Sequence, residues 1–346
     1  MKMQRREFLA NSGTALGIGM LNQSEGEVPM KGAHHFQRHQ AKRRRELWSL
    51  LGDLPALRTP KATASSRETH PGFTLERLVL DLNGIEPVPA WMLIPDKRQT
   101  PAPAMLYIHW HGGDYPVGKR ELLEGTKVLP PYASVLAEKG IVTLAIDSWC
   151  FGERMPYPKE GGRGESDRFK EMLWKGQVLF GMMMFDEFQA LNYLCGRSEV
   201  DPERIGAFGI SMGATKAWWL AALDERIRCC IDLCCLTDYE ALIAHQGLGG
   251  HGVYYYVPRL LQHFNTAQIN ELSVPRPRLS LNGRKDKLTP PEGVERVRDH
   301  LLPLYAKYGD EKDCHIELFD CGHTELPEMR DLILSWLDTH LTTPKK

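Results

Sequence analysis

The sequence has almost no excess of charge of either sign. Its 346 residues include 43 Lys and Arg against 44 Asp and Glu, a formal net charge of −1. That balance gives no electrostatic reason to expect a nucleic acid as partner. An internal repeat and an apolar run long enough to cross a bilayer as a helix are also missing. These absences argue against a repeat array or a membrane-spanning protein, and the length suits one large domain or two small ones.

The N-terminal stretch MKMQRREFLANSGTALGIGML is too short and too rich in glycine to span a membrane stably. It has a charged start with Arg5 and Arg6, followed by Phe8 and Leu9 and a weakly apolar run. This pattern resembles a twin-arginine export signal, although a clean small-x-small cleavage site is missing. We therefore expect a signal and linker over residues 1–30 and a periplasmic or secreted protein, with a cytoplasmic location as the alternative.

Positive charge is concentrated at one place only, the KRRR cluster at 42–45. It directly precedes Glu46, Leu47 and Trp48, so we interpret it as the solvated start of a helix over about 44–51. Residues 31–72 are predicted to form a helical and irregular N-terminal extension. A regular alternation of strands and helices begins at Phe73, and residues 73–346 are predicted to form the main domain.

Cysteine is present in moderate number, and four of the eight residues lie in RCCIDLCC as Cys229, Cys230, Cys234 and Cys235. If this segment is a strand, neighbouring side chains point to opposite faces. The four thiols then cannot converge on one metal, and vicinal disulfides would distort the strand. We interpret them as buried thiols of a core strand.

The rest of the chain alternates short apolar runs with helical patterns. Two strands around Asn83-Gly84 predict an antiparallel hairpin. The later apolar runs are typical of buried parallel strands, and they lie at 104–110, 141–147, 204–210, 228–235, 277–283 and 315–320. We therefore predict an α/β fold: a mostly parallel central sheet opened by an antiparallel β-hairpin, with helices on both faces. Two long segments, 148–175 and 238–272, are predicted to be rim loops of a pocket.

The segment RIGAFGISMGATKAWW changes at Ser211 from an apolar strand pattern to a helix pattern. Gly209 and Gly213 flank the serine, so strand and helix can approach without Cβ clashes. A strand, a G-x-S-x-G turn and a helix form a nucleophile elbow, which exposes the serine at a helix N-terminus. Ser211 is therefore the candidate nucleophile.

A serine nucleophile needs a base and an acid that orients the base. In folds with this elbow the chain order is serine, acid, histidine. Asp286 follows the strand at 277–283 and His323 follows the strand at 315–320, so both are predicted at the same sheet edge as Ser211. Asp320 and Asp238 are the alternative acids.

Backbone amides are the candidate oxyanion donors. One would come from Met212, directly after the serine, and one from the loop HWHGGD, where His111 is favoured and Gly112 is next. His109 and His111 could instead chelate a metal, but no third ligand at suitable spacing is apparent, so no metal is predicted.

With these motifs in place, the chain resembles the α/β-hydrolase superfamily from about residue 73 to residue 341. Within it, the chain is most similar to the acetyl xylan esterase and dienelactone hydrolase group. The likeness is carried by LWSLLGDLP, YIHWHGG, IDSWCFGER, GISMGA, LNGRKDKLTP and DCGHTE. The resemblance implies a catalytic domain over 73–346 with a Ser211–His323–Asp286 triad and hydrolysis of a carboxylic ester, without cofactor.

The chain also departs from that group. Met212-Gly213-Ala214 follow the serine instead of Gln-Gly-Gly-type residues, and Thr324 follows His323 instead of Glu. Dienelactone hydrolases carry a cysteine nucleophile. The resemblance therefore does not identify the substrate of this chain. We expect acetyl or other small acyl esters of small molecules or carbohydrates.

Aromatic side chains are the expected substrate-binding residues, because they lie in or beside the predicted rim. The candidates are Trp110, Trp149, Tyr254 and Tyr255. The alternative is that these side chains only pack the rim loops onto the domain. A small prolyl-oligopeptidase-like peptidase and a non-catalytic binding protein with this fold are the alternative functions. The sequence gives no signal for the oligomeric state.

Overall fold

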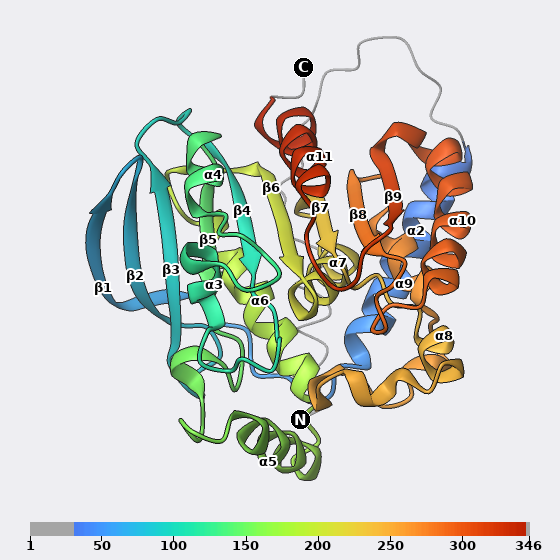
Figure 1. The fold of residues 1–346 in the computed structure, drawn as a ribbon, viewed down its shortest axis with the longest axis horizontal. Coiled ribbons are helices and arrows are strands. Elements are labelled where there is room, and N and C mark those ends of the chain that lie inside the picture. The colour runs from blue at the N-terminus through green and yellow to red at the C-terminus, as the bar shows by residue number, and fades with distance from the viewer. Residues whose placement is uncertain (1–30, 344–346) are drawn as a thin grey trace.

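The computed structural model describes residues 31–343, and the predicted export signal lies outside them. A nine-stranded sheet runs through the centre in the order β1-β2-β3-β5-β4-β6-β7-β8-β9 (Figure 1). The strands are β1 Lys61–His70, β2 Phe73–Asp81, β3 Val88–Pro95, β4 Ala102–Ile108, β5 Val142–Ile146, β6 Val200–Ile210, β7 Ile227–Leu233, β8 Arg278–Gly283 and β9 Cys314–Phe319.

The strand directions confirm the predicted fold class. β2 and β3 form the antiparallel hairpin around Asn83-Gly84, and β3 pairs antiparallel with β5. From β5 to β9 every neighbouring pair is parallel. β3, β4, β5 and β8 are buried along their whole length, because both faces of the sheet are covered.

Helices cover the sheet in two layers. One apolar core joins the sheet to α2, α6, α7 and α10, and a second joins its other face to α3, α4 and α11. The helices are α2 Lys31–Ser49, α3 Glu121–Glu124, α4 Ala133–Glu138, α5 Gly161–Trp174, α6 Leu179–Cys195, α7 Met212–Leu223, α8 Tyr239–Ala244, α9 Thr266–Asn270, α10 Pro291–Tyr308 and α11 Pro327–Leu337. Within residues 31–343, no helix combines the length and the apolar character needed to cross a membrane.

The sheet begins before the residue at which the sequence pattern places its start. β1 pairs antiparallel with β2, and its side chains from Lys61 to Thr69 are exposed. Its sequence, KATASSRETH, has no alternation of apolar and polar residues, because only its backbone is used in pairing. Periodicity of hydrophobic residues could not reveal such an edge strand.

The two predicted rim loops contain helices. Residues 148–175 include α5, a helix of 14 residues, and residues 238–272 include α8, α9 and the short 3-10 helix η4, Val253–Tyr255. The glycines and prolines at the start of the first segment conceal the helix that follows. α5 contacts η4, so the two segments meet over one end of the sheet, at the bottom of the view in Figure 1.

The cysteine-rich strand is shorter than predicted. β7 ends at Leu233, so Cys234 and Cys235 follow the strand, and Cys234 has a φ of 55°. On the strand, Cys229 and Cys230 belong to the cores on opposite faces, as the alternation requires. All four thiols are buried and free, which confirms that part of the interpretation.

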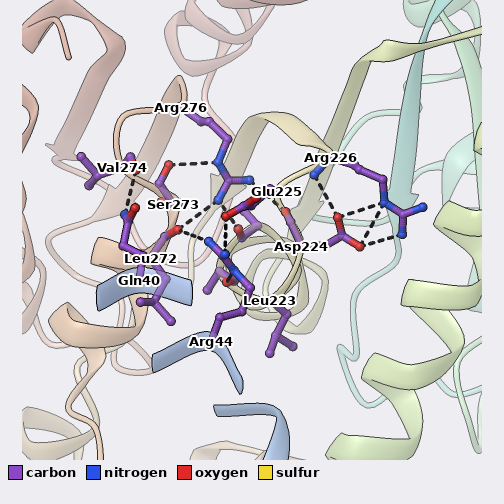
Figure 2. Close-up of polar contacts among 12 residues, drawn as sticks. Gln40, Arg44, Leu223, Asp224, Glu225, Arg226, Leu272, Ser273, Val274 and Arg276 are labelled. Atoms are coloured by element: carbon purple, nitrogen blue, oxygen red, sulfur yellow. Dashed lines mark hydrogen bonds and ion pairs between the residues drawn. The ribbon is translucent and has the colours of Figure 1, made fainter. Parts of the chain in front are cut away.

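The basic cluster at 42–45 is not a solvated helix start. It lies in the middle of α2, and Arg44 is 7% exposed. The Arg44 guanidinium donates to Ala222 O at 2.9 Å and to Leu272 O at 3.0 Å, and it pairs with the Glu225 carboxylate (Figure 2). Arg276 donates to Asp224 O at 2.9 Å beside it. Two cations thus lie at the C-terminus of α7, where the helix dipole is negative.

Replacing Arg44 with alanine should destabilise the fold. The change leaves the carbonyl of Ala222, at the end of α7, without its Arg44 donor, which costs about 1–3 kcal/mol. We expect an equal loss in the free energy of unfolding measured with urea. Arg45→Ala is the matched control, because Arg45 is exposed on the same helix. Equal stability of the two variants would contradict the anchoring role of Arg44.

Candidate active site

The sharpest bend of the chain is at Ser211, between β6 and α7. Its φ of 59° and ψ of −120° are rare for a residue with a side chain and cost of order 1–3 kcal/mol. The surrounding fold holds this conformation, because Ser211 N donates to Leu233 O at 3.0 Å and Ser211 O accepts from Thr215 N at 3.0 Å. The serine is thereby fixed at the positive end of the α7 dipole.

The flanking glycines are required by close backbone contact. A Cβ on Gly213 would lie 1.9 Å from Ile108 O, and a Cβ on Gly209 would lie 2.4 Å from the same atom. Both distances are far below van der Waals contact, so no side chain fits at either position. The end of β4 therefore lies directly against the turn that carries Ser211.

Asp286 and His323 form a hydrogen-bonded pair. His323 Nδ1 lies 2.7 Å from Asp286 Oδ2, and Asp286 is 4% exposed. Asp286 Oδ1 accepts from Leu288 N at 2.9 Å, which fixes the carboxylate plane. The alternative acids are engaged elsewhere: the Asp320 carboxylate lies 2.9 Å from Lys285 Nζ, and the Asp238 carboxylate accepts from Arg296 at 2.7 Å.

Ser211 and the Asp286–His323 pair are linked through the last residue of β7 and the residue that follows it. Ser211 N bonds to Leu233 O, and the next residue, Cys234, has its thiol within 4.8 Å of the ligand-type atoms of Asp286 and His323. Across residues 31–343, these three form the one group whose donor atoms are close enough to hold a metal ion. The Asp286–His323 hydrogen bond already uses two of the three donors.

Of the candidate oxyanion donors, the amides of Met212 and His111 donate no hydrogen bond to any group within residues 31–343. Gly112 has a φ of 55°, and a Cβ there would collide with the Trp110 ring, so the loop depends on this glycine. His109 and His111 do not form a metal pair. His109 is fully buried and uses both ring nitrogens within the fold, and His111 bonds to Glu165.

His109 fixes the peptide that carries the His111 amide. Ser148 N donates to His109 Nε2 at 3.0 Å, so the ring proton is on Nδ1, which donates to Trp110 O at 2.7 Å. Burial, and next to it the charge of Lys216, holds the pKa of His109 well below its usual value, so the ring stays neutral. In a trans peptide C=O and N–H point in opposite directions. The hydrogen bond from His109 holds Trp110 O on its own side, so the His111 N–H of the same peptide points away from His109.

The four aromatic residues predicted to bind substrate are all buried, at 1–5% exposure. Tyr254 stacks on His111 with ring centres 5.5 Å apart, so it contacts the candidate oxyanion loop from η4. Tyr255 stacks on His251 at 4.2 Å. Trp110 packs in the core with α3 and α4, and Trp149 lies under the guanidinium of Arg154 at 4.5 Å. For these two, the alternative of packing the loops onto the domain fits better.

Sequence reasoning missed residues that line this region. His251 Nε2 lies 3.0 Å from Leu288 O, and Leu288 N donates to Asp286 Oδ1, so His251 is close to the proposed acid. Glu165, on α5, bonds to His111 and Tyr115. Both residues lie in segments that are predicted to be rim loops. Without a helical pattern of hydrophobic residues, the direction of their side chains could not be predicted.

The sequence matches no protein-family model. A curated protein of Bacillus subtilis (strain 168), named "Putative hydrolase YtaP", is 44% identical over 304 residues, which cover 87% of this chain and 99% of that protein.

Solved structures with esterase names share the fold. One, described as a "putative acetyl xylan esterase" from Bacteroides fragilis NCTC 9343, has a TM-score of 0.70 at 18% identity, covering 89% of this chain and 88% of its own. Another, named methylesterase BT1017, has a TM-score of 0.65 at 16% identity and covers 98% of this chain and 68% of its own. At these low sequence identities, the similarity to the two solved structures shows a shared fold only.

Proposed function

Because the chain belongs to the α/β-hydrolase superfamily, in one family with the hydrolase YtaP, we propose that it is a serine carboxylic ester hydrolase that acts through an acyl-enzyme. The observation that supports this most is the 2.7 Å Asp286–His323 pair beside a strained elbow serine. Ser211 is the proposed nucleophile, His323 the base and Asp286 the acid that orients it.

In the proposed reaction, His323 takes the proton of Ser211 as the hydroxyl attacks the ester carbonyl. The amides of Met212 and His111 stabilise the negative oxygen that forms, at a place where both are free to donate. Asp286 stabilises the imidazolium. His323 then protonates the leaving alcohol and activates the water that hydrolyses the acyl-enzyme. These steps need only groups of this chain and water.

The proposed substrates are acetyl or other small acyl esters, including esters of carbohydrates. The names of the structural relatives, an acetyl xylan esterase and a methylesterase, support an ester of this kind. Tyr254 stacks on the candidate oxyanion loop and is 2% exposed, which favours a short acyl group.

A series of p-nitrophenyl esters from acetate to octanoate tests this function. We expect turnover to be highest for acetate and to fall as the acyl chain lengthens, because the Tyr254 side chain against the candidate oxyanion loop is buried. Absence of turnover on every member by folded protein would contradict the proposal. Turnover that rises toward octanoate would agree with the proposed ester hydrolysis but contradict the proposed preference for a small acyl group.

Loss of His109 should weaken the oxyanion site. His109→Phe removes the bond to Trp110 O, so we expect kcat for p-nitrophenyl acetate to fall about 10²-fold with KM little changed. His109→Asn keeps a side-chain N–H near the Nδ1 position and should restore a large part of the loss. A fall in KM and kcat alike, or no rescue by asparagine, would indicate a structural role only.

We also propose export through the twin-arginine route, on the basis of Arg5, Arg6, Phe8 and Leu9. This proposal rests on the sequence alone, because these residues precede the part of the chain that the structure describes.

A further inference from the structure

One buried acidic group contacts the candidate oxyanion loop and, within residues 31–343, forms no ion pair with a lysine or arginine. Glu165 is 2% exposed, and its Oε2 accepts from Tyr115 OH at 2.8 Å and lies 3.2 Å from His111 Nε2. Its second oxygen, Oε1, has no hydrogen-bond partner within residues 31–343. A buried polar atom without a partner costs free energy, so it calls for a physical explanation.

The histidine beside Glu165 does not supply the missing positive charge. Gly113 N donates to His111 Nδ1 at 3.1 Å, so Nδ1 carries no proton and the ring is neutral. His111 Nε2–H therefore donates to Glu165 Oε2 together with the Tyr115 hydroxyl. The two groups that the structure shows hydrogen-bonding to Glu165 are thus neutral donors, and both use the same oxygen.

The location of Glu165 connects it to the proposed oxyanion loop. The ring of His111 lies against Tyr115, Phe151 and Tyr254, with ring centres 5.0–5.5 Å apart. Glu165 projects from α5, the helix in the long segment after β5, onto this aromatic cluster. A ligand held near the His111 amide would lie beside the cluster that Glu165 joins.

We propose that Glu165 recognises a hydroxyl group on the alcohol part of the ester. This inference rests on the proposed esterase function and adds the residue that selects the substrate. Glu165 Oε1 needs a donor, and a hydroxyl group of a polyol such as a sugar supplies one.

The test compares two acetyl esters of methyl xyloside: a mono-O-acetylated one, in which the other hydroxyls are free, and the fully acetylated one, in which none is free. We expect the wild type to favour the first. Glu165→Gln should raise KM for the mono-acetylated substrate about 10-fold to 100-fold, because a charge-assisted hydrogen bond is lost. KM for the fully acetylated substrate and for p-nitrophenyl acetate should change little. Glu171→Gln is the matched control, since that side chain lies on the same helix and is 43% exposed.

Other results would overturn the inference. An equal loss on all three substrates, carried by kcat, would mean that Glu165 only orients His111. Equal use of the two xylosides by the wild type, or a preference for a choline ester, would refute hydroxyl recognition. Binding of methyl xyloside to Ser211→Ala, measured by calorimetry, should also weaken in the double variant with Glu165→Gln. No turnover of p-nitrophenyl acetate by the wild type would defeat the esterase proposal itself, which separates the two failures.

Discussion

Ser211→Ala should abolish ester hydrolysis, lowering kcat for p-nitrophenyl acetate by about 10⁶-fold. The reason is that Ser211 provides the oxygen that forms the acyl-enzyme, and no other hydroxyl replaces it at the elbow. KM should stay within a few-fold of the wild-type value, since the removed atom reacts rather than binds. The measurement is steady-state turnover with p-nitrophenyl acetate, followed by release of p-nitrophenolate.

The variant must be compared with a serine change away from the site. Ser49→Ala is suitable, because Ser49 is exposed at the end of α2. Ser211→Ala should remain folded, since alanine is smaller and the backbone bonds of Ser211 to Leu233 and Thr215 do not involve its hydroxyl. Activity above one per cent of wild type in folded Ser211→Ala would mean that another residue is the nucleophile.

Asp286→Asn should lower kcat by about 10⁴-fold. Asp286 accepts from His323 Nδ1 at 2.7 Å, which leaves Nε2 free to act as the base. An asparagine can donate its amide N–H to Nδ1, and the ring proton then moves to Nε2, where it blocks proton transfer from Ser211. The imidazolium also loses its stabilising charge. Turnover measured from pH 6 to pH 9 should stay low throughout.

Asp320→Asn is the matched control for the acid. Its side chain is 79% exposed, it is paired with Lys285, and it was the alternative acid by position in the sequence. We expect it to keep wild-type activity. Loss of activity in Asp320→Asn with activity retained in Asp286→Asn would reverse the assignment of the acid.

Much of the fold and of the candidate site could be predicted from the sequence. The α/β class and the resemblance to the α/β-hydrolase superfamily are confirmed, because buried parallel strands produce apolar runs that stand out from the helices between them. The start of α7 at Met212 agrees with the prediction, because the change of pattern at Ser211 is abrupt. The Asp286–His323 contact followed from the placement of both residues after neighbouring parallel strands.

The errors arise where tertiary contacts decide the structure. β1 is an exposed edge strand without hydrophobic alternation, so only its backbone pairing identifies it. Arg44 was read as solvated because a charge cluster is usually exposed, but here the C-terminus of α7 requires a cation. Glu165 could not be placed at all, because its importance depends on α5 folding back onto the loop after β4.

The central claim, that Ser211 is activated for nucleophilic attack, is tested most directly by a fluorophosphonate probe followed by mass spectrometry. The wild type should gain one probe per chain, and peptide mapping should place it on Ser211. Asp286→Asn should react far more slowly, and Ser211→Ala should not react. A probe found on another residue, or no labelling of the folded wild type, would contradict the account.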